Sequence, residues 1–282
     1  MIRDKIMAEL VIMKAFREQK SFSANFISAS RPVNFSFPAH WHVYIELVYV
    51  IQGVIEVGIN NESRTLCKGD MAVFSSNDIH YLQSTNSEIY LFIFNPAILD
   101  AQAGWPKCGI LKNPFFTREQ IPAHIKASIF AIYRNSNPQL EAEQLKTKAN
   151  VLNLFSFILS KGKTERQSYS KIIQRERMQH VLEYIETNFT QKITLDQAAS
   201  VAHMSRFYFS SFFKSLTGMG FVNYVNTIRV NEAEQLLINS SKNIADIAFE
   251  CGFESIRTFN RVFKEVKKKK PIELRKTEKG LD

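Results

Sequence analysis

One structural pattern occurs twice in succession between residues 192 and 275, and this repeat constrains the fold more than any other feature of the chain. The first copy reads ITLDQAASVAHMSRFYFSSFFKSLTG and the second reads NIADIAFECGFESIRTFNRVFKEVKK. The positions that recur 49 residues later are Leu195, Ala198, Ala199, Ala202 and Met204, matched by Ile244, Ile247, Ala248, Cys251 and Phe253. Those that recur 50 residues later are Ser205, Phe209, Phe212, Phe213 and Lys214, matched by Ser255, Phe259, Val262, Phe263 and Lys264. A repeat of this size predicts a duplicated supersecondary unit.

In each copy the second helix has two chemically different faces. Large apolar residues stand at i, i+3, i+4 and i+7, which is the spacing of one buried stripe on a helix. The stripe consists of Phe209, Phe212, Phe213 and Leu216 in the first copy and of Phe259, Val262, Phe263 and Val266 in the second. The residues left facing outward are Arg206, Phe207, Ser210, Ser211 and Lys214 in the first copy and Arg257, Asn260, Arg261 and Lys264 in the second.

These outward faces predict DNA binding through two helix-turn-helix units. In such a unit the first helix braces the second, whose N-terminal turns enter the major groove of double-stranded DNA. Arginine suits bidentate contact with guanine and asparagine with adenine, while Phe207 suits a thymine methyl group. Lys214 and Lys264 are expected to hold phosphates and so to fix register rather than sequence. A plain helical bundle would explain the buried stripes, but not the matching polar residues on both outward faces.

The stretch from about residue 171 to 276 resembles the DNA-binding domain of AraC/XylS-type transcription regulators. The matching pieces are LDQAASVAHMS with FKSLTG, the run YVNTIRVNEAEQLL, and IADIAFECGFES with FNRVFK and PIELRK. The resemblance implies a sequence-specific regulator whose units, at about 195–217 and 244–267, are joined by a helix from about Phe221 to Leu237. It also implies RNA polymerase as a partner if the protein is an activator. His203 and Lys268 depart from the family, because they stand where it usually has turn glycines, and a non-glycine residue with positive φ is uncommon.

Basic charge is concentrated in the same stretch. The 282 residues carry 36 Lys+Arg and 27 Asp+Glu, which gives a net charge of +9. Residues 1–160 hold 15 basic against 13 acidic residues, or +2, and residues 161–282 hold 21 against 14, or +7. This excess fits phosphate neutralisation by the DNA-binding half. The scattered Cys67, Cys108 and Cys251, with no uncharged apolar run near about 20 residues, predict a reduced cytoplasmic protein without a membrane segment.

The sequence changes character between about Phe22 and Phe94. Short β-branched and aromatic runs such as YIELVYVIQGVIEVGI and IYLFIF are separated by turn residues, which predicts an antiparallel barrel or sandwich. Within this region His40, His42, Glu46 and Gly53 follow HxHx3Ex6G spacing. The first three share parity, so on one strand they would point the same way, into the barrel. Further on, Gly69 and His80 keep the spacing of a second motif.

These two blocks resemble the paired motifs of cupins, a small β-barrel fold that AraC-type regulators commonly carry as an effector-sensing domain. In metal cupins the corresponding residues bind an ion. Carried over, the candidate ligands of a divalent Zn, Fe, Mn or Ni ion are His40, His42, Glu46 and His80. The sequence departs from the cupin pattern at Ser75 and Asn77, where proline and glycine are expected.

Two other uses of these residues stay open. They could contact a small organic effector, with Trp41 and Tyr44 stacking on a ligand ring; the family suggests a sugar. Alternatively they could only satisfy one another in the mouth of the barrel. No cofactor is required under either interpretation.

Two amphipathic helices are expected after the barrel, at about Thr117 to Arg134 and Pro138 to Ser160. In the family such helices resemble a dimerisation seam, which favours a homodimer, although they could equally cover the barrel within one chain. The polar run KGKTERQSYS at 161–170 is interpreted as an interdomain linker. The predicted organisation is a sensing and dimerisation domain at 1–160, the linker, and a DNA-binding domain at 171–282.

The predicted fold class is α+β multidomain, with a cupin-like antiparallel β-barrel, two following helices and an all-α domain with two helix-turn-helix motifs. The predicted function is a sequence-specific, non-enzymatic transcription regulator controlled by a small-molecule effector in the barrel. Two alternatives remain: a metal-dependent cupin enzyme fused to a DNA-binding domain, and a non-specific nucleic-acid binder.

Overall fold

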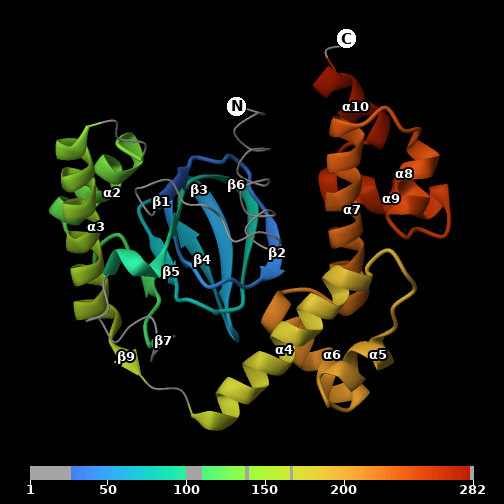
Figure 1. Ribbon diagram of the computed structural model, residues 1–282, viewed down its shortest axis with the longest axis horizontal. Helices are drawn as coiled ribbons and strands as arrows, with labels where there is room; N and C mark the ends of the chain where they lie inside the picture. The colour runs from blue at the N-terminus through green and yellow to red at the C-terminus, as the bar shows by residue number, and fades with distance from the viewer. Residues whose placement is uncertain (1–26, 100–109, 137–139, 166–167, 280–282) are drawn as a thin grey trace. The chain divides into compact units, whose positions relative to one another are not determined.

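The computed structural model separates the chain into two compact parts, Met1–Ile173 and Gln174–Asp282 (Figure 1). It describes residues 27–99, 110–136, 140–165 and 168–279. Residues 22–26 of the expected β-region, Cys108, and residues 166–167 of the expected linker lie outside these ranges.

An antiparallel sheet forms the body of the N-terminal part (Figure 1). Its strands are β1 (Ile27–Ser30), β2 (Phe37–His40), β3 (Ile45–Ile59), β4 (Glu62–Cys67), β5 (Met71–Phe74), β6 (His80–Phe94) and β8 (Phe115–Phe116). The long strands β3 and β6 pair from Ile45↔Phe94 to Ile59↔His80. On its other side β6 pairs with β1 and β2, while β3 pairs with β4 and β5, and β5 with β8. The antiparallel β-region that the sequence predicted is confirmed.

Alternate residues of β3 belong to two different apolar cores. Ile45 and Leu47 join a cluster that includes α2 (Ala123–Arg134) and α3 (Glu141–Gly162), the two helices packed against each other in Figure 1. Val48 belongs to a second cluster, made almost wholly of strand residues. Because neighbouring side chains of a strand point to opposite faces, Glu46 lies on the side of this second cluster.

The first helix after the sheet begins later than the sequence predicted. It starts at Ala123 instead of Thr117, and its N-cap Pro122 has an extended backbone with ψ of 158°. The ring of a proline disfavours helical backbone at the preceding residue, so Ile121 cannot continue a helix into Pro122. Pro122 is the sequence signal for the start of this helix, and helical periodicity alone does not reveal it.

The predicted linker at 161–170 is largely occupied by regular structure. Helix α3 runs on to Gly162, and β9 (Thr164–Glu165) pairs with β7 (Ile110–Leu111). Helix α4 (Tyr169–Asn188) then begins and crosses the boundary between the two parts. Gly162 fits here because a Cβ would come within 3.0 Å of the Leu111 side chain, so the helix end packs closely on β7.

The C-terminal part is helical, as predicted. Its helices after α4 are α5 (Leu195–Val201), α6 (Arg206–Thr217), α7 (Phe221–Asn239), α8 (Ile244–Glu250), α9 (Ile256–Lys267) and α10 (Pro271–Lys279). The pairs α5–α6 and α8–α9 fall within the two predicted helix-turn-helix segments, and α7 is the predicted connecting helix. Among the described helices, none is long and apolar enough to cross a membrane.

Candidate nucleic-acid interface and barrel site

Both outward-facing helices begin at serine caps. Ser205 Oγ accepts the backbone N–H of Tyr208, and Ser255 Oγ accepts that of Thr258 at 3.2 Å. Each cap satisfies one of the amides that a helix start leaves unpaired. The first residue of each helix is therefore fixed, and with it the direction in which its N-terminal side chains point.

The turn before each of these helices uses the same backbone conformation with different residues. In the first unit His203 has φ of 53°, and in the second Gly252 has φ of 83°. Met204 N–H donates to the Ala199 carbonyl, and Phe253 N–H donates to the Ala248 carbonyl, both at 3.0 Å. This is the six-to-one bond of a Schellman turn, so His203 keeps the glycine-type geometry that its identity left open.

The predicted apolar stripes form the cores of the two units. Phe209, Phe213, Phe259 and Phe263 are fully buried. Phe212 is only partly buried and stacks on the Tyr208 ring, with centroids 5.8 Å apart.

All nine residues predicted to face DNA are exposed, and Phe207 is 86% exposed. The nine are Arg206, Phe207, Ser210, Ser211 and Lys214 on α6, and Arg257, Asn260, Arg261 and Lys264 on α9. Each of these two capped helices therefore buries apolar side chains and exposes mainly polar ones, and both helices lie in the same compact part of the protein.

Two arginines of these faces have carboxylate partners within the chain. Arg206 Nη1 lies 2.8 Å from Asp196 Oδ2, and Arg261 Nη1 lies 2.8 Å from Glu265 Oε1. Both pairs are exposed, so they contribute little stability, and DNA phosphates or bases can replace the carboxylates at small cost. The short lysine run is different, because Lys267 turns inward to Glu234 of α7.

The second candidate site lies in the sheet of the N-terminal part. His40 ends β2, His42 lies between β2 and β3, Glu46 is on β3, and His80 begins β6. The expectation that the first three share one strand is wrong, because the chain leaves β2 after His40 and enters β3 only at Ile45. The four residues nevertheless converge: all are buried, and one ligand atom from each lies within 4.8 Å of the others.

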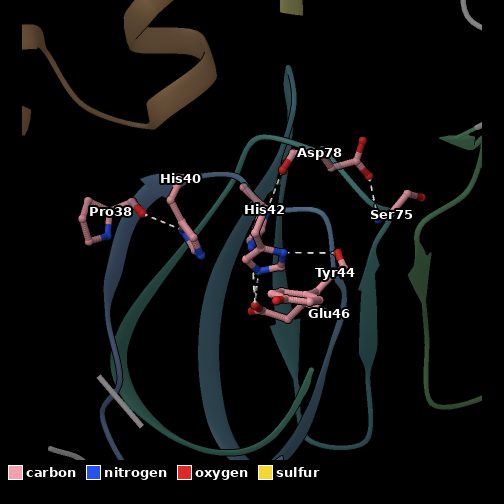
Figure 2. A network of polar contacts seen from close by, with 8 residues as sticks. Pro38, His40, His42, Tyr44, Glu46, Ser75 and Asp78 are labelled. Carbon is pink, nitrogen blue, oxygen red and sulfur yellow. Dashed lines mark hydrogen bonds and ion pairs between the residues drawn. The ribbon is translucent and has the colours of Figure 1, made fainter. Parts of the chain in front are cut away.

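A backbone carbonyl two residues away fixes each imidazole, as Figure 2 shows for His40 with Pro38 and for His42 with Tyr44. The Nδ1 atoms of His40, His42 and His80 lie 3.1, 3.2 and 2.9 Å from the carbonyl oxygens of Pro38, Tyr44 and Asp78. A carbonyl oxygen can only accept a hydrogen bond, so Nδ1 carries the proton in each ring. In a neutral ring Nε2 then presents a lone pair. In metal sites, a hydrogen-bond partner of the other ring nitrogen commonly holds a ligating histidine in this arrangement.

The electrostatics of the cluster favour neutral forms of His40 and His42 beside an ionised Glu46 carboxylate. Burial lowers the pKa of His40 and of His42. Burial alone would raise the pKa of Glu46, but its imidazole neighbours hold that pKa well below the usual range. Glu46 Oε2 lies 3.1 Å from His42 Nε2 and 3.5 Å from His80 Nε2. A neutral Nε2 and a carboxylate are both acceptors, so either a proton on Nε2 or a bound cation would join them.

The four residue types and their spacing fit a divalent transition metal ion. Bonds of about 2.0–2.2 Å place ligand atoms at most about 4.4 Å apart across the ion. The observed span of 4.8 Å needs only a small contraction. The cluster is therefore a candidate metal centre of three imidazoles and one carboxylate.

Sequence reasoning missed the groups that hold this cluster in place. Asp78 accepts the Ser75 N–H at 2.8 Å and the Asn60 side-chain amide at 2.9 Å, and it supplies the carbonyl that holds His80. Asn77 has φ of 67° and so takes the conformation expected of the missing glycine. An Asn-Asp pair before a strand is a turn signal that could have identified this loop.

The two aromatic candidates have different surroundings. The Tyr44 ring is buried in the second cluster, 5.7 Å from that of His42. Trp41 is half-buried, and its Nε1 has no hydrogen-bond partner among the described residues.

Comparison with known proteins agrees with both halves of the chain. A helix-turn-helix domain model matches residues 198–277, and a cupin domain model matches residues 30–94. The uncharacterized HTH-type transcriptional regulator YdeC of Bacillus subtilis (strain 168) is 20% identical over 86% of this chain and 88% of its own. The melibiose operon regulatory protein of Escherichia coli (strain K12) is 24% identical over 84% of this chain and 83% of its own.

A solved structure shares the fold of most of the chain. Apo ToxT of Vibrio cholerae strain SCE256 is 14% identical, covers 89% of this chain and 97% of its own, and gives a TM-score of 0.51. Tandem helix-turn-helix units follow a cupin-type sheet in the sequence, and the chain is similar over most of its length to transcription regulators of the AraC family.

Proposed function

We propose that α6 and α9 read two successive major-groove segments of one operator, and that a ligand held in the barrel controls this binding. The observation that carries the DNA-binding half is the exposure of all nine predicted contact residues on two serine-capped helices. Arg206, Phe207, Ser210 and Ser211 are assigned to one segment and Arg257, Asn260 and Arg261 to the next. The assigned phosphate contacts are Lys214 and Lys264.

Two substitutions on α9 separate base reading from phosphate contact. Arg261→Ala should weaken binding to the selected operator by about 1–3 kcal/mol and relax preference at one position. Lys264→Ala should weaken binding to all sequences alike and reduce the salt dependence of affinity by about one unit of slope. Gel-shift titrations over a range of salt concentrations measure both.

The exposed Arg118 of the N-terminal part provides a matched control. Arg118→Ala should leave both the affinity and the salt slope unchanged. Unchanged operator binding by Arg261→Ala would remove that residue from the base-reading set.

Selection from random DNA tests the proposed two-part site as a whole. The full chain should enrich two motifs separated by about one helical turn. A flat sequence preference would identify a non-specific nucleic-acid binder instead.

The ligand that best fits the barrel is a divalent transition metal ion held by His40, His42, Glu46 and His80. Its support is the convergence of three oriented imidazoles on one buried carboxylate. A bound ion would join the ends of β2 and β6 to β3. Three imidazoles and a carboxylate suit Zn, Fe, Mn or Ni.

A metal titration tests this assignment. Purified protein should retain about one ion per chain in elemental analysis, and chelation should lower its unfolding temperature. Readdition at about 100 times the dissociation constant should restore about 2.7 kcal/mol of stability. His80→Ala should abolish the response, whereas His124→Ala, on the exposed side of α2, should preserve it. An equal response in His80→Ala, or no response to any of the four ions, contradicts the metal assignment.

A sugar is the second candidate effector, because the relative from Escherichia coli is a melibiose operon regulatory protein. Under this interpretation the same four residues, with Trp41 and Tyr44, contact the ligand. Operator affinity measured with a panel of sugars, in chelated and metal-loaded protein, separates the two candidates.

A regulatory role for the barrel is favoured over the metal-dependent enzyme, because both full-length relatives above are transcription regulators. Turnover of a small molecule by metal-loaded protein at a constant rate would reverse this preference. If the protein activates transcription, RNA polymerase is its further partner.

Helix α3 is proposed as a homodimer seam. Leu145 is 68% exposed and Leu152 is 43% exposed, seven residues apart on one face. The exposed Ala149 lies between them, whereas Leu159, another seven residues on, is partly buried against the core. Apolar residues at heptad spacing on an exposed helix face are typical of a helix that pairs with a second helix.

A further inference from the structure

The second helix-turn-helix unit meets the segment that joins α4 to the first unit, at a joint made of Phe189–Gln191, Arg229 of α7 and the Gly252–Phe253 turn. Arg229 Nε donates to the Phe189 carbonyl at 2.7 Å, and its Nη2 donates to the Gln191 carbonyl at 2.8 Å. The Cζ atom of the same guanidinium lies 5.8 Å from the centre of the Phe253 ring. One side chain of the connecting helix thus contacts both the second unit and the segment that leads into the first.

The chemistry of this contact requires arginine. The planar guanidinium presents donors in a fixed fork, which meets two carbonyls at once, and its face stacks on an aromatic ring. A lysine in its place would offer a single flexible point charge. Burial lowers the pKa of Arg229, with Glu254 opposing the shift.

Gly252 shows how closely the second unit approaches the segment that leads into the first. A Cβ at this position would lie 2.5 Å from the Thr190 carbonyl oxygen and 2.8 Å from that of Phe189. The turn of the second unit therefore lies directly on the backbone segment that Arg229 holds. His203, its counterpart in the first unit, is exposed, so a full side chain is tolerated there.

Beside the joint lies a cleft of about 330 Å³. Thr190, Lys192 and Ile193 line it from the segment between α4 and α5, and Phe249 and Glu254 line it from the second unit, with α7 residues completing the wall. Across this cleft the position of the second unit depends on α7 and on the joint.

We propose that Arg229 is a positioning residue that fixes the distance and angle between α6 and α9, and thereby the half-site spacing that the protein accepts. This inference rests on the proposed reading of DNA by both helices. Each added base pair moves a half-site by about 3.4 Å and rotates it by about 35° around the duplex. A rigidly joined pair of helices cannot follow that change, whereas a loosened pair can.

The test compares full-length variants on duplexes that carry the selected two-part site with its spacer unchanged, shortened or lengthened by one base pair. The wild-type affinity should fall on the order of tenfold or more for either altered spacer, about the cost of a mismatched base pair. In Arg229→Lys and Arg229→Gln this discrimination should shrink by about three- to tenfold, which corresponds to roughly 0.7–1.4 kcal/mol.

Gly252→Ala disturbs the joint from its other side and should also reduce or shift the preferred spacing. The matched control is His203→Ala, at the equivalent turn away from the joint, which should keep the wild-type spacing profile. Circular dichroism establishes that each variant is folded. If Arg229→Gln does not fold, Gly252→Ala still tests the proposal.

The outcomes are distinguishable. Folded variants at both positions that lose affinity equally for every spacer overturn the positioning role and leave Arg229 a purely structural residue. Wild-type protein that binds all spacers equally overturns the rigid pair. Wild-type protein that selects no two-part site contradicts the proposed function itself.

Discussion

At the residue scale, the two copies of the repeat place glycine at different left-handed positions. The first unit has His203 at the turn and Gly218 at the end of its outward-facing helix, whereas the second has Gly252 and Lys268 at these places. Lys268 keeps φ of 58°, close to the 73° of Gly218. Since side chains with a Cβ are strained in this region, the second unit carries a cost at Lys268 that the first avoids at Gly218.

Lys268→Gly should therefore stabilise the C-terminal part by about 0.5–1 kcal/mol. The relieved strain of about 1–2 kcal/mol exceeds the additional backbone entropy of glycine, roughly 0.5–1 kcal/mol. Chemical unfolding followed by the helical circular-dichroism signal measures the change. The reciprocal control, Gly218→Ala, should be destabilising, and a Lys268→Gly variant with lowered stability would show that the lysine side chain outweighs the strain.

At the scale of an element, helix α3 has one side buried in the N-terminal part and another side, the proposed dimer seam, exposed. Val151, Leu154 and Ile158 are fully buried against the rest of the N-terminal part, and Leu145 and Leu152 lie on the opposite, exposed side. Covering the barrel and pairing with a second copy are therefore compatible roles for this helix.

Leu145→Lys and Leu152→Lys should each weaken the proposed dimer by about 1.5–3 kcal/mol, because a leucine that is buried on association contributes roughly that much. Sedimentation equilibrium measures the dissociation constant. Leu140→Lys is the matched control, since Leu140 is exposed at the start of α3 but lies off the seam. A monomeric wild-type chain, or equal dimerisation by all three variants, contradicts the seam.

The elements with strong periodicity or clear end signals were predictable from sequence. The Ser205 and Ser255 caps and the phenylalanine stripes placed α6 and α9 closely, and the H-x-H and E spacing placed the barrel cluster. The features that could not be predicted from sequence depend on contacts between segments that are distant along the chain. Arg229 is one polar residue in a mixed helix, and only its meeting with Phe189, Gln191 and Phe253 reveals the joint. The role of Asp78 likewise follows only from its contacts with Asn60, Ser75 and His80.

At the scale of the whole molecule, the proposed function requires that the barrel ligand and DNA change each other's affinity. A ligand alters DNA binding only if it binds two states of the protein with different free energies, and the effect is reciprocal. The Glu46 cluster joins three separate strand ends, so an occupied and an empty cluster are expected to differ in stability.

Loading the cluster should therefore change operator affinity by about 5–150-fold, and operator DNA should change metal affinity by the same factor. Calorimetric metal titrations with and without the selected operator measure the second quantity, and gel-shift titrations measure the first. The His124→Ala variant should behave as wild type in both. Identical metal affinity in the two titrations would show that the barrel does not signal to the DNA-binding helices through this ion.

The placement of Gly252 on the Thr190 backbone has a consequence for how the protein meets a promoter. The two copies are not interchangeable, and α7 runs in one direction from the first to the second. A single bound molecule is therefore asymmetric along the duplex, and its operator has a direction as well as a sequence. Inverting that operator in front of a gene reverses the orientation of the bound molecule. We therefore expect transcription to change less when the operator is moved by whole helical turns than when it is inverted.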